Sequence, residues 1–172
     1  MVNLSKSKYC ALWQCPKMLW LRKYKPELAE VDSHTLSIME TGNAVGDLAM
    51  GLFGDFTEVT VYTDGEIDLP AMMRRTQEEI AKDTPVICEA SFEWNGLYCA
   101  VDILRREDDG WAIYEVKSST SDDKAVYIAD VAYQKFVLEH CGVKVTGTYL
   151  VVLNRDYIFD GTLDLQKLFK GT

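Results

Sequence analysis

Three residues near the middle of the chain carry side chains suited to phosphate chemistry. Asp102 is followed at a hairpin's distance by Glu115 and Lys117, in V-D-I-L-R-R-E-D-D-G-W-A-I-Y-E-V-K. Because side chains alternate along a strand, Glu115 and Lys117 should share one face. If the two strands pair across the charged loop, Asp102 lies close to Glu115. Two carboxylates and one ammonium would then converge at one end of a sheet.

Such a cluster is costly without a partner, because neighbouring like charges repel and burial disfavours ionised groups. A divalent cation removes both costs. Mg²⁺ typically takes one or two protein carboxylates and keeps positions for water and phosphate. We therefore expect Asp102 and Glu115 to hold Mg²⁺ or Mn²⁺, with Lys117 offsetting charge on a phosphate. The alternative is a surface hairpin with an ordinary cross-strand ion pair, worth about 0–1 kcal/mol.

The surrounding residues extend this pattern over nearly the whole chain. Asp102, the tripeptide Glu115-Val116-Lys117 and Gln134 together resemble the PD-(D/E)XK nuclease superfamily, in particular its RecB/Cas4-like exonuclease branch. The opening L-S-K-S-K-Y, the pair Cys15-Pro16 and Y-E-V-K-S-S-T are similar to the N-terminal nuclease domain of a group of longer bacterial proteins. The resemblance implies an α/β, restriction-endonuclease-like fold: a mixed central sheet flanked by helices, in the order α-β-β-β-α-β.

The resemblance also implies a function, metal-dependent hydrolysis of DNA at ends or in single strands by an exonuclease-like enzyme. The Val116 carbonyl would assist in holding the metal, and Gln134 would orient Lys117 or contact DNA. The alternative is a catalytically inactive docking or nucleic-acid-binding module with the same fold. The acidic net charge favours that module, whereas the intact D…E-x-K cluster argues against it.

Two further carboxylates stand where relatives carry metal-site residues. Related nucleases place a metal-contacting His in a Gly-rich helical segment, and Asp47 occupies that place in T-G-N-A-V-G-D-L-A. They also carry an acidic residue on the strand that holds Glu89, which would support the metal site or hold a second ion. The alternatives are a solvent-facing helical Asp47 and an ordinary strand charge at Glu89.

The chain departs from the family pattern in two places. The exonuclease motif has Tyr four residues after the Gln, whereas Leu138 stands there and Tyr133 precedes Gln134. Cas4-like relatives bind an iron–sulfur cluster through four thiolates. Only Cys15 matches that set, and no Cys follows Cys141. We therefore expect no iron–sulfur cluster within this chain and a structural role for Cys15.

Composition is typical of one globular domain over residues 1–172, since 48% of the residues are hydrophobic. No apolar run approaches the roughly 20 residues that span a bilayer, and the lysine-bearing N-terminus lacks the apolar stretch expected of a secretory signal. An odd count of five cysteines indicates reduced thiols and a cytoplasmic protein without a membrane partner. The abrupt end at Gly171-Thr172 suggests an excised N-terminal domain or a naturally short relative.

Charge is distributed unevenly along the chain. The net charge is −9, yet the first 26 residues carry six lysines and arginines before the first acidic residue, Glu27. Nucleic-acid affinity comes largely from such residues. With DNA as the expected partner, the candidate contacts are Lys6, Lys8, Lys17, Arg22 and Tyr133. The alternative for this basic segment, residues 1–25, is a solvated helix face.

The hydrophobic pattern predicts the elements that must position these residues. We expect helices over 4–24 (with a break at Pro16), 34–52, 70–82 and 125–140, and strands over 56–62, 86–94, 97–105, 111–116 and 147–154. Asn95-Gly96 predicts a type I′ turn. The Trp and Leu stripe of residues 12–20 is interpreted as core, Asp130 as part of a polar helix face, and the strand over 147–154 as buried on both faces.

Overall fold

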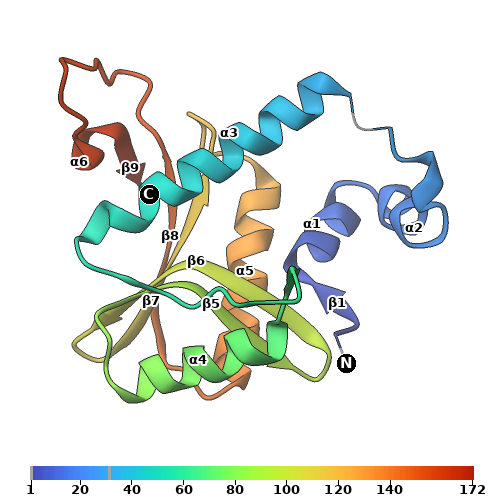
Figure 1. The fold of residues 1–172 in the computed structure, drawn as a ribbon, viewed down its shortest axis with the longest axis horizontal. Coiled ribbons are helices and arrows are strands. Elements are labelled where there is room, and N and C mark those ends of the chain that lie inside the picture. The colour runs from blue at the N-terminus through green and yellow to red at the C-terminus, as the bar shows by residue number, and fades with distance from the viewer. Residues whose placement is uncertain (1, 31) are drawn as a thin grey trace.

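A mixed, curled sheet with helices on both sides forms the centre of the molecule (Figure 1). The computed structural model describes residues 2–30 and 32–172. The expected α/β class is confirmed. Neighbouring strands follow the order β2 (Thr57–Glu58), β5 (Val86–Trp94), β6 (Leu97–Glu107), β7 (Gly110–Lys117), β8 (Val145–Leu153) and β9 (Phe169–Gly171). β1 (Leu4–Ser5) pairs in parallel with the start of β6.

The helices follow the predicted spacing closely. They are α1 (Lys6–Gln14), α2 (Pro16–Tyr24), α3 (Ser33–Met50), α4 (Leu69–Ala81), α5 (Ala125–His140) and the short α6 (Leu165–Leu168). Short 3₁₀ turns η1 (Pro26–Leu28) and η2 (Gly51–Phe53) follow α2 and α3, and β3 (Tyr62–Thr63) pairs with β4 (Glu66–Ile67). Among the described helices, none is both long and apolar enough to cross a membrane.

Strands β5, β6 and β7 form an antiparallel meander, and α5 then crosses over to β8, which runs parallel to β7. The expected turn between β5 and β6 is present, since Asn95 and Gly96 both have positive φ angles, 49° and 84°. This topology brings the middle of β6 beside the C-terminal half of β7, which is the part of the sheet that carries Asp102 and Glu115.

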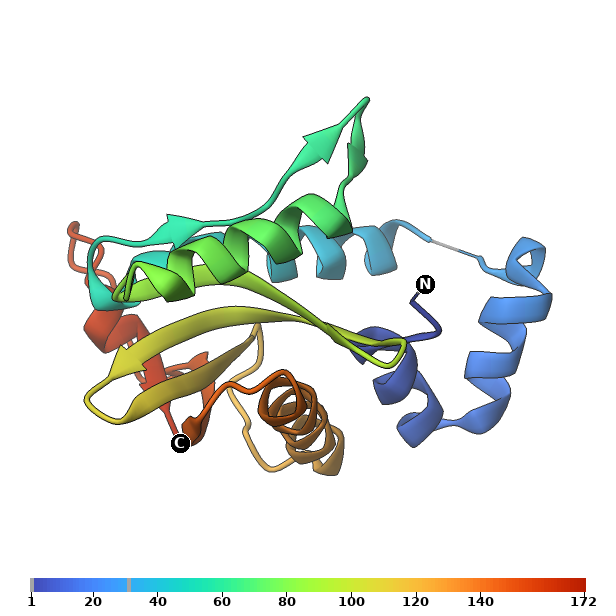
Figure 2. The same ribbon diagram turned by 90° about the horizontal axis from the view of Figure 1, so that it is seen from below.

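Two apolar layers hold the helices on the sheet. Figure 2 shows α3 and α4 on one side and α5 on the other. The α3 layer includes Val45, Ala49 and Met50 packed with Ile103 and Tyr114. The α5 layer packs helix residues against the opposite side of the sheet, with these members among others: Val137, Leu138, Val101, Leu104 and Ile113.

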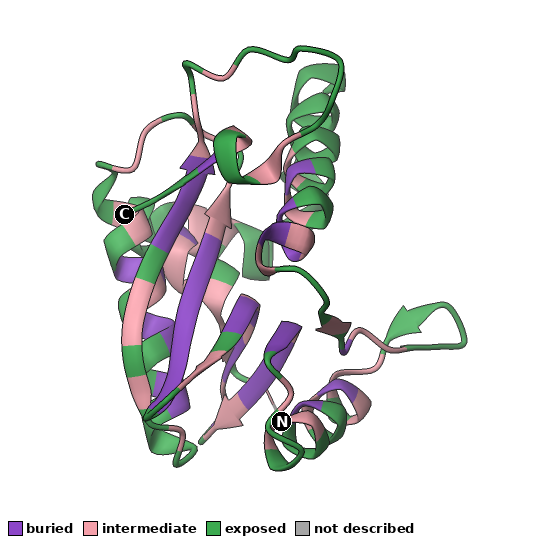
Figure 3. Ribbon diagram, turned by 90° about the vertical axis from the view of Figure 1, so that its left-hand side faces the viewer, coloured by how far each residue is buried: buried purple, intermediate pink, exposed green. Residues whose placement is uncertain are grey.

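The N-terminal helices correct one expectation. The break expected at Pro16 is present, since Pro16 starts a second helix, and Ser5 caps the first. However, Trp13 is 57% exposed and Trp20 52% exposed, so their interpretation as core is wrong. Figure 1 shows α2 lying well away from the sheet. In the same way, α3 is buried only along its C-terminal half (Figure 3). Helical spacing identifies an apolar face without showing whether anything covers it.

Two expected strands are shorter or less buried than predicted. The strand over 56–62 is reduced to β2, and the chain returns to strand only at β3. In β8, the fully buried residues are Leu150, Val151 and Val152. The neighbouring β9 pairs with Val151–Leu153, and Thr172 continues the pairing to Leu150, so among the described residues the first half of β8 has no strand beside it on that edge.

Candidate metal and phosphate site

A cavity of about 660 Å³ lies between α3, the β2–β4 segment and strands β5, β6 and β7. Every charged residue that lines it is acidic: Asp47, Glu58, Glu89, Asp102 and Glu115. A concave site with one sign of charge concentrates its field and attracts ions of the opposite sign. The structure therefore brings all the predicted metal-site carboxylates to one cavity and adds Glu58, which the sequence analysis missed.

Asp102 and Glu115 sit next to each other on paired strands. The antiparallel register pairs Ile103 with Tyr114, so Asp102 and Glu115 occupy the next pair of facing positions. The backbone N–H of Val116 donates to Asp102 Oδ2 at 2.7 Å, which fixes the aspartate. Lys117 Nζ donates to Glu115 Oε1 at 2.6 Å, as expected for side chains on one face of a strand.

The ammonium of Lys6 lies between the two carboxylates. It donates to both Glu115 oxygens, at 3.1 and 2.9 Å, and its Nζ lies 3.5 Å from Asp102 Oδ1. Lys6 is the first residue of α1, directly after β1, and β1 is held against β6. It was predicted to contact phosphate, and that role stays a prediction. Local sequence patterns carry no signal for this pairing, because Lys6 and Glu115 lie 109 positions apart in the chain.

Asp130 and Gln134 support the cluster from α5. Lys117 Nζ donates to Asp130 Oδ2 at 2.6 Å, and Gln134 Nε2 donates to Asp130 Oδ1 and Glu115 Oε2 at 2.9 and 2.7 Å. Asp130 is 3% exposed, so its placement on a polar face is wrong. Gln134 does not contact Lys117 directly; it connects the two carboxylates that do. The sequence did contain a signal for Asp130, because residues four apart share a helix face and Gln134 was already expected in the site.

Asp102 and Glu115 are neighbours, but their pKa values are shifted in opposite directions. Burial, and then the neighbouring Glu115, raise the pKa of Asp102 to about 6. Burial acts in the same direction on Glu115, but Lys6 and Lys117 outweigh it and lower its pKa to about 2. Burial opposes the charge on Lys117 too, yet Glu115 and Asp130 hold the pKa of its ammonium well above the ordinary value. Glu115 and Lys117 are therefore charged at neutral pH, whereas Asp102 titrates close to it.

Glu89 has an unusual backbone conformation. Its φ is 58°, and the pairing of β5 with β6 skips it, passing from Cys88–Ile103 to Ala90–Val101. This irregularity is a β-bulge, which re-aims a side chain. A non-glycine residue in this conformation costs about 1–3 kcal/mol, and such strain gathers at functional sites. Burial, and then Asp102, raise the pKa of Glu89 to about 7. Strand periodicity gives no sign of the bulge.

The predicted nucleic-acid contacts lie in different environments. Lys8, Lys17 and Arg22 are exposed on α1 and α2. Tyr133 corrects the prediction, because it is only 7% exposed and stacks on Tyr9. Its hydroxyl donates to the Leu4 carbonyl at 2.8 Å, so Tyr133 holds β1 in place rather than presenting a surface to DNA.

A smaller cavity of about 280 Å³ lies on the α1 side of Glu115. It is lined by Lys6, Arg22, Lys117 and Asp130, together with uncharged residues of α1 and with Glu115 itself. Glu115 thus lines both cavities, one with acidic charges only and one with three cations. The charges of the larger cavity would attract a cation, whereas the smaller cavity carries one more cation than carboxylates.

All five cysteines are free thiols, and Cys15 is exposed between α1 and α2. Within residues 2–30 and 32–172, no three His, Cys, Asp or Glu side chains already converge to hold a metal ion. Between Asp102 and Glu115 lies the Lys6 ammonium, which forms an ion pair with each of them.

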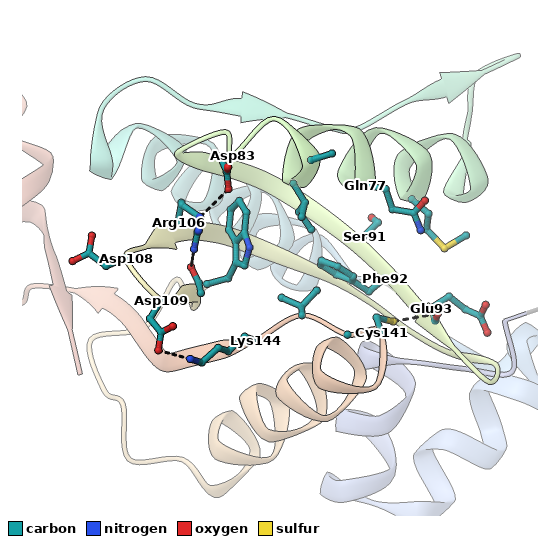
Figure 4. Close-up of a pocket in the computed structure, with 17 residues that line it drawn as sticks. Gln77, Asp83, Ser91, Phe92, Glu93, Arg106, Asp108, Asp109, Cys141 and Lys144 are labelled. Atoms are coloured by element: carbon teal, nitrogen blue, oxygen red, sulfur yellow. Dashed lines mark hydrogen bonds and ion pairs between the residues drawn. The ribbon is translucent and has the colours of Figure 1, made fainter.

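A separate cavity of about 560 Å³ lies between α4, β5, the β6–β7 turn and the segment between α5 and β8 (Figure 4). Several of its charges are paired with one another: Arg106 donates to Asp83 at 3.0 Å, and Lys144 pairs with Asp109. Much of the remaining wall is apolar and includes Trp111. No described residue lines both this cavity and the one at Asp102, and its own walls carry arginine and lysine as well as carboxylates.

Comparison of the chain with protein-family models, with curated proteins and with solved structures found no match. Its function must therefore be inferred from the geometry and chemistry of the site.

Proposed function

We propose that the chain is a metal-dependent DNA nuclease with a PD-(D/E)XK, restriction-endonuclease-like core. The observation that carries the proposal is the shared cation position: Asp102 and Glu115 hold one ammonium between them, and Lys117 is bonded to the same glutamate. The element order supports it, since α4-β5-β6-β7-α5-β8 runs α-β-β-β-α-β. The antiparallel meander followed by a parallel β8 is the arrangement expected of that core.

The donor set fits Mg²⁺ or Mn²⁺. Carboxylate oxygens and Val116 line the cavity, and hard cations prefer oxygen ligands. The Lys6 ammonium is a stand-in for such an ion, because it is the charge that these oxygens attract in this structure. Mg²⁺ needs only one or two carboxylates when water completes its shell. Asp102, Glu115 and the Val116 carbonyl would hold the ion, with Glu89 or Asp47 reached through water.

Each residue of the cluster has a distinct role in phosphodiester hydrolysis. A bound ion supplies Lewis-acid chemistry, polarising a phosphate oxygen and acidifying water. Lys117, charged at neutral pH, offsets the negative charge that grows on the phosphate oxygens as water attacks in line. Asp130 and Gln134 are positioning residues, because they hold Lys117 and Glu115 through short hydrogen bonds. By analogy with the family, the products would carry 5′-phosphates.

The basic N-terminal segment supports DNA as the substrate. Lys8, Lys17 and Arg22 are exposed on α1 and α2, and Arg22 lines the cavity that also holds Lys117. Backbone phosphates entering from this side would meet cations first and the carboxylates last. Contacts of this kind neutralise phosphates and make affinity fall steeply with salt.

The test is cleavage of end-labelled single- and double-stranded DNA with Mn²⁺, Mg²⁺ or EDTA. Asp102→Asn and Lys117→Met should each reduce cleavage at least a hundredfold, whereas Lys124→Met, an exposed lysine outside both cavities, should cleave normally. Far-UV circular dichroism checks that each variant folds. If the wild type neither cleaves DNA nor binds Mn²⁺, the proposal is wrong and an inactive docking or nucleic-acid-binding module remains.

A further inference from the structure

Lys6 is a cation built into the site from a distant part of the chain. Its side chain is only 17% exposed, and its ammonium contacts Glu115 and Asp102 at 2.9 and 3.5 Å. These are the two carboxylates assigned to the metal. Burial disfavours the charge on Lys6, but Asp102, Glu115 and Asp130 outweigh it and hold the pKa of the ammonium well above the ordinary value.

The backbone that carries Lys6 is firmly anchored. Leu4 pairs with Leu97 at the start of β6, and its N–H donates to the Gly96 carbonyl at 3.0 Å. The Tyr133 hydroxyl donates a hydrogen bond to the Leu4 carbonyl, and the Ser5 side chain caps α1. With these contacts in place, the ammonium moves only by rotation of its own four-carbon stem.

We propose that Lys6 is an internal counter-ion that occupies the divalent-cation position, and that metal binding displaces its ammonium into the smaller cavity. This inference rests on the metal site of the proposed function. Lys6 already lines the smaller cavity, so its displacement needs no backbone movement. There it remains near Asp130 and joins Arg22 and Lys117 on the side from which we expect phosphate to arrive.

Two consequences follow from electrostatics. A divalent ion must compete with a tethered ammonium for the same oxygens, so the wild-type affinity for metal is lower than the carboxylates alone would give. Once displaced, Lys6 no longer neutralises the metal-site carboxylates, so the smaller cavity, lined by Lys6, Arg22 and Lys117 beside Asp130, becomes more positive and would attract an anion such as a phosphate. The ammonium would thus keep the carboxylates neutralised before metal and DNA arrive and then become a phosphate contact.

The first test measures Mn²⁺ affinity by electron paramagnetic resonance of the free ion. Lys6→Met should bind Mn²⁺ at least tenfold more tightly than the wild type, and the matched control Lys8→Met, on the same helix but exposed, should stay within twofold. Equal or weaker binding by Lys6→Met, with binding still abolished in Asp102→Asn, would overturn the inference and leave the metal site intact. Absence of binding in both the wild type and Lys6→Met would overturn the metal site and the inference together.

A second test uses the wild-type protein, so it does not depend on how a variant folds. Reductive methylation followed by mass spectrometry reports how accessible each lysine is. Saturating Mg²⁺ should speed methylation of Lys6 at least threefold while Lys8 reacts at an unchanged rate. A Lys6 rate that is unchanged or slower at saturating Mg²⁺ would contradict displacement.

Discussion

Glu89 is a partly buried carboxylate whose charge should destabilise the metal-free protein. Its side chain lines the acidic cavity from a bulge in β5, and its pKa rises from the ordinary 4.5 to about 7 because of burial and the nearby Asp102. In Glu89→Gln the side chain keeps its length and the backbone keeps the same positive φ. The substitution therefore removes the charge and leaves the strain unchanged.

The sign and size of the effect follow from proton linkage. The native-state pKa lies above the unfolded-state value, so the native protein binds more protons between about pH 4 and about pH 8, and stability falls as pH rises through that range. Each pKa unit corresponds to about 1.4 kcal/mol, which sets an upper bound of about 3 kcal/mol at alkaline pH. Because Glu89 is partly exposed, solvent screening reduces the expected gain in Glu89→Gln to about 2 kcal/mol.

The assay is urea unfolding in EDTA from pH 4 to pH 9. The free energy of unfolding of Glu89→Gln should match the wild type at pH 4 and exceed it by about 2 kcal/mol at pH 9. Glu58→Gln is the control, since Glu58 lines the same cavity but is exposed, and it should stay within about 0.5 kcal/mol throughout. A Glu89→Gln protein no more stable than the wild type at pH 9, or equally stabilised at pH 4, would refute the reasoning.

Three further outcomes are expected. Asp130→Asn should lower the free energy of unfolding by only about 1 kcal/mol in urea titrations, because Lys117 loses one of its two carboxylates while burial and Glu115, which raise the pKa of Asp130, already disfavour its charge; an unchanged midpoint would contradict this. Tyr133→Phe should cost about 1 kcal/mol through loss of the bond to the Leu4 carbonyl, measured in the same way, whereas a larger loss would indicate broader damage to β1. The affinity for Mn²⁺, followed by calorimetry, should rise from about pH 5 to about pH 8, because protons leave Asp102 and Glu89 over this range, and a flat profile would exclude both as ligands.

The sequence predicted the parts of the site that depend on local structure. Alternation along β7 placed Glu115 and Lys117 on one face, and the hairpin brought Asp102 to the same point. Helix limits were also predictable, because capping and breaking residues such as Ser5, Asp32 and Pro16 act locally.

The remaining features depend on how distant segments pack. Lys6 reaches Glu115 only because β1 adds to the sheet, and Asp130 is buried only because α5 turns that face toward β7. The exposure of Trp13 and Trp20 depends on where α2 lies, which helical periodicity does not determine. The bulge at Glu89 could not be predicted, because it leaves no mark on the hydrophobic pattern of β5.

The most direct measurement is the anomalous scattering of a crystal grown with Mn²⁺. We predict a peak between Asp102 and Glu115, beside the Val116 carbonyl, with the Lys6 ammonium moved toward Asp130. Full Mn²⁺ saturation in solution without a peak at these carboxylates, or a peak only elsewhere on the chain, would contradict the metal site on which the account depends.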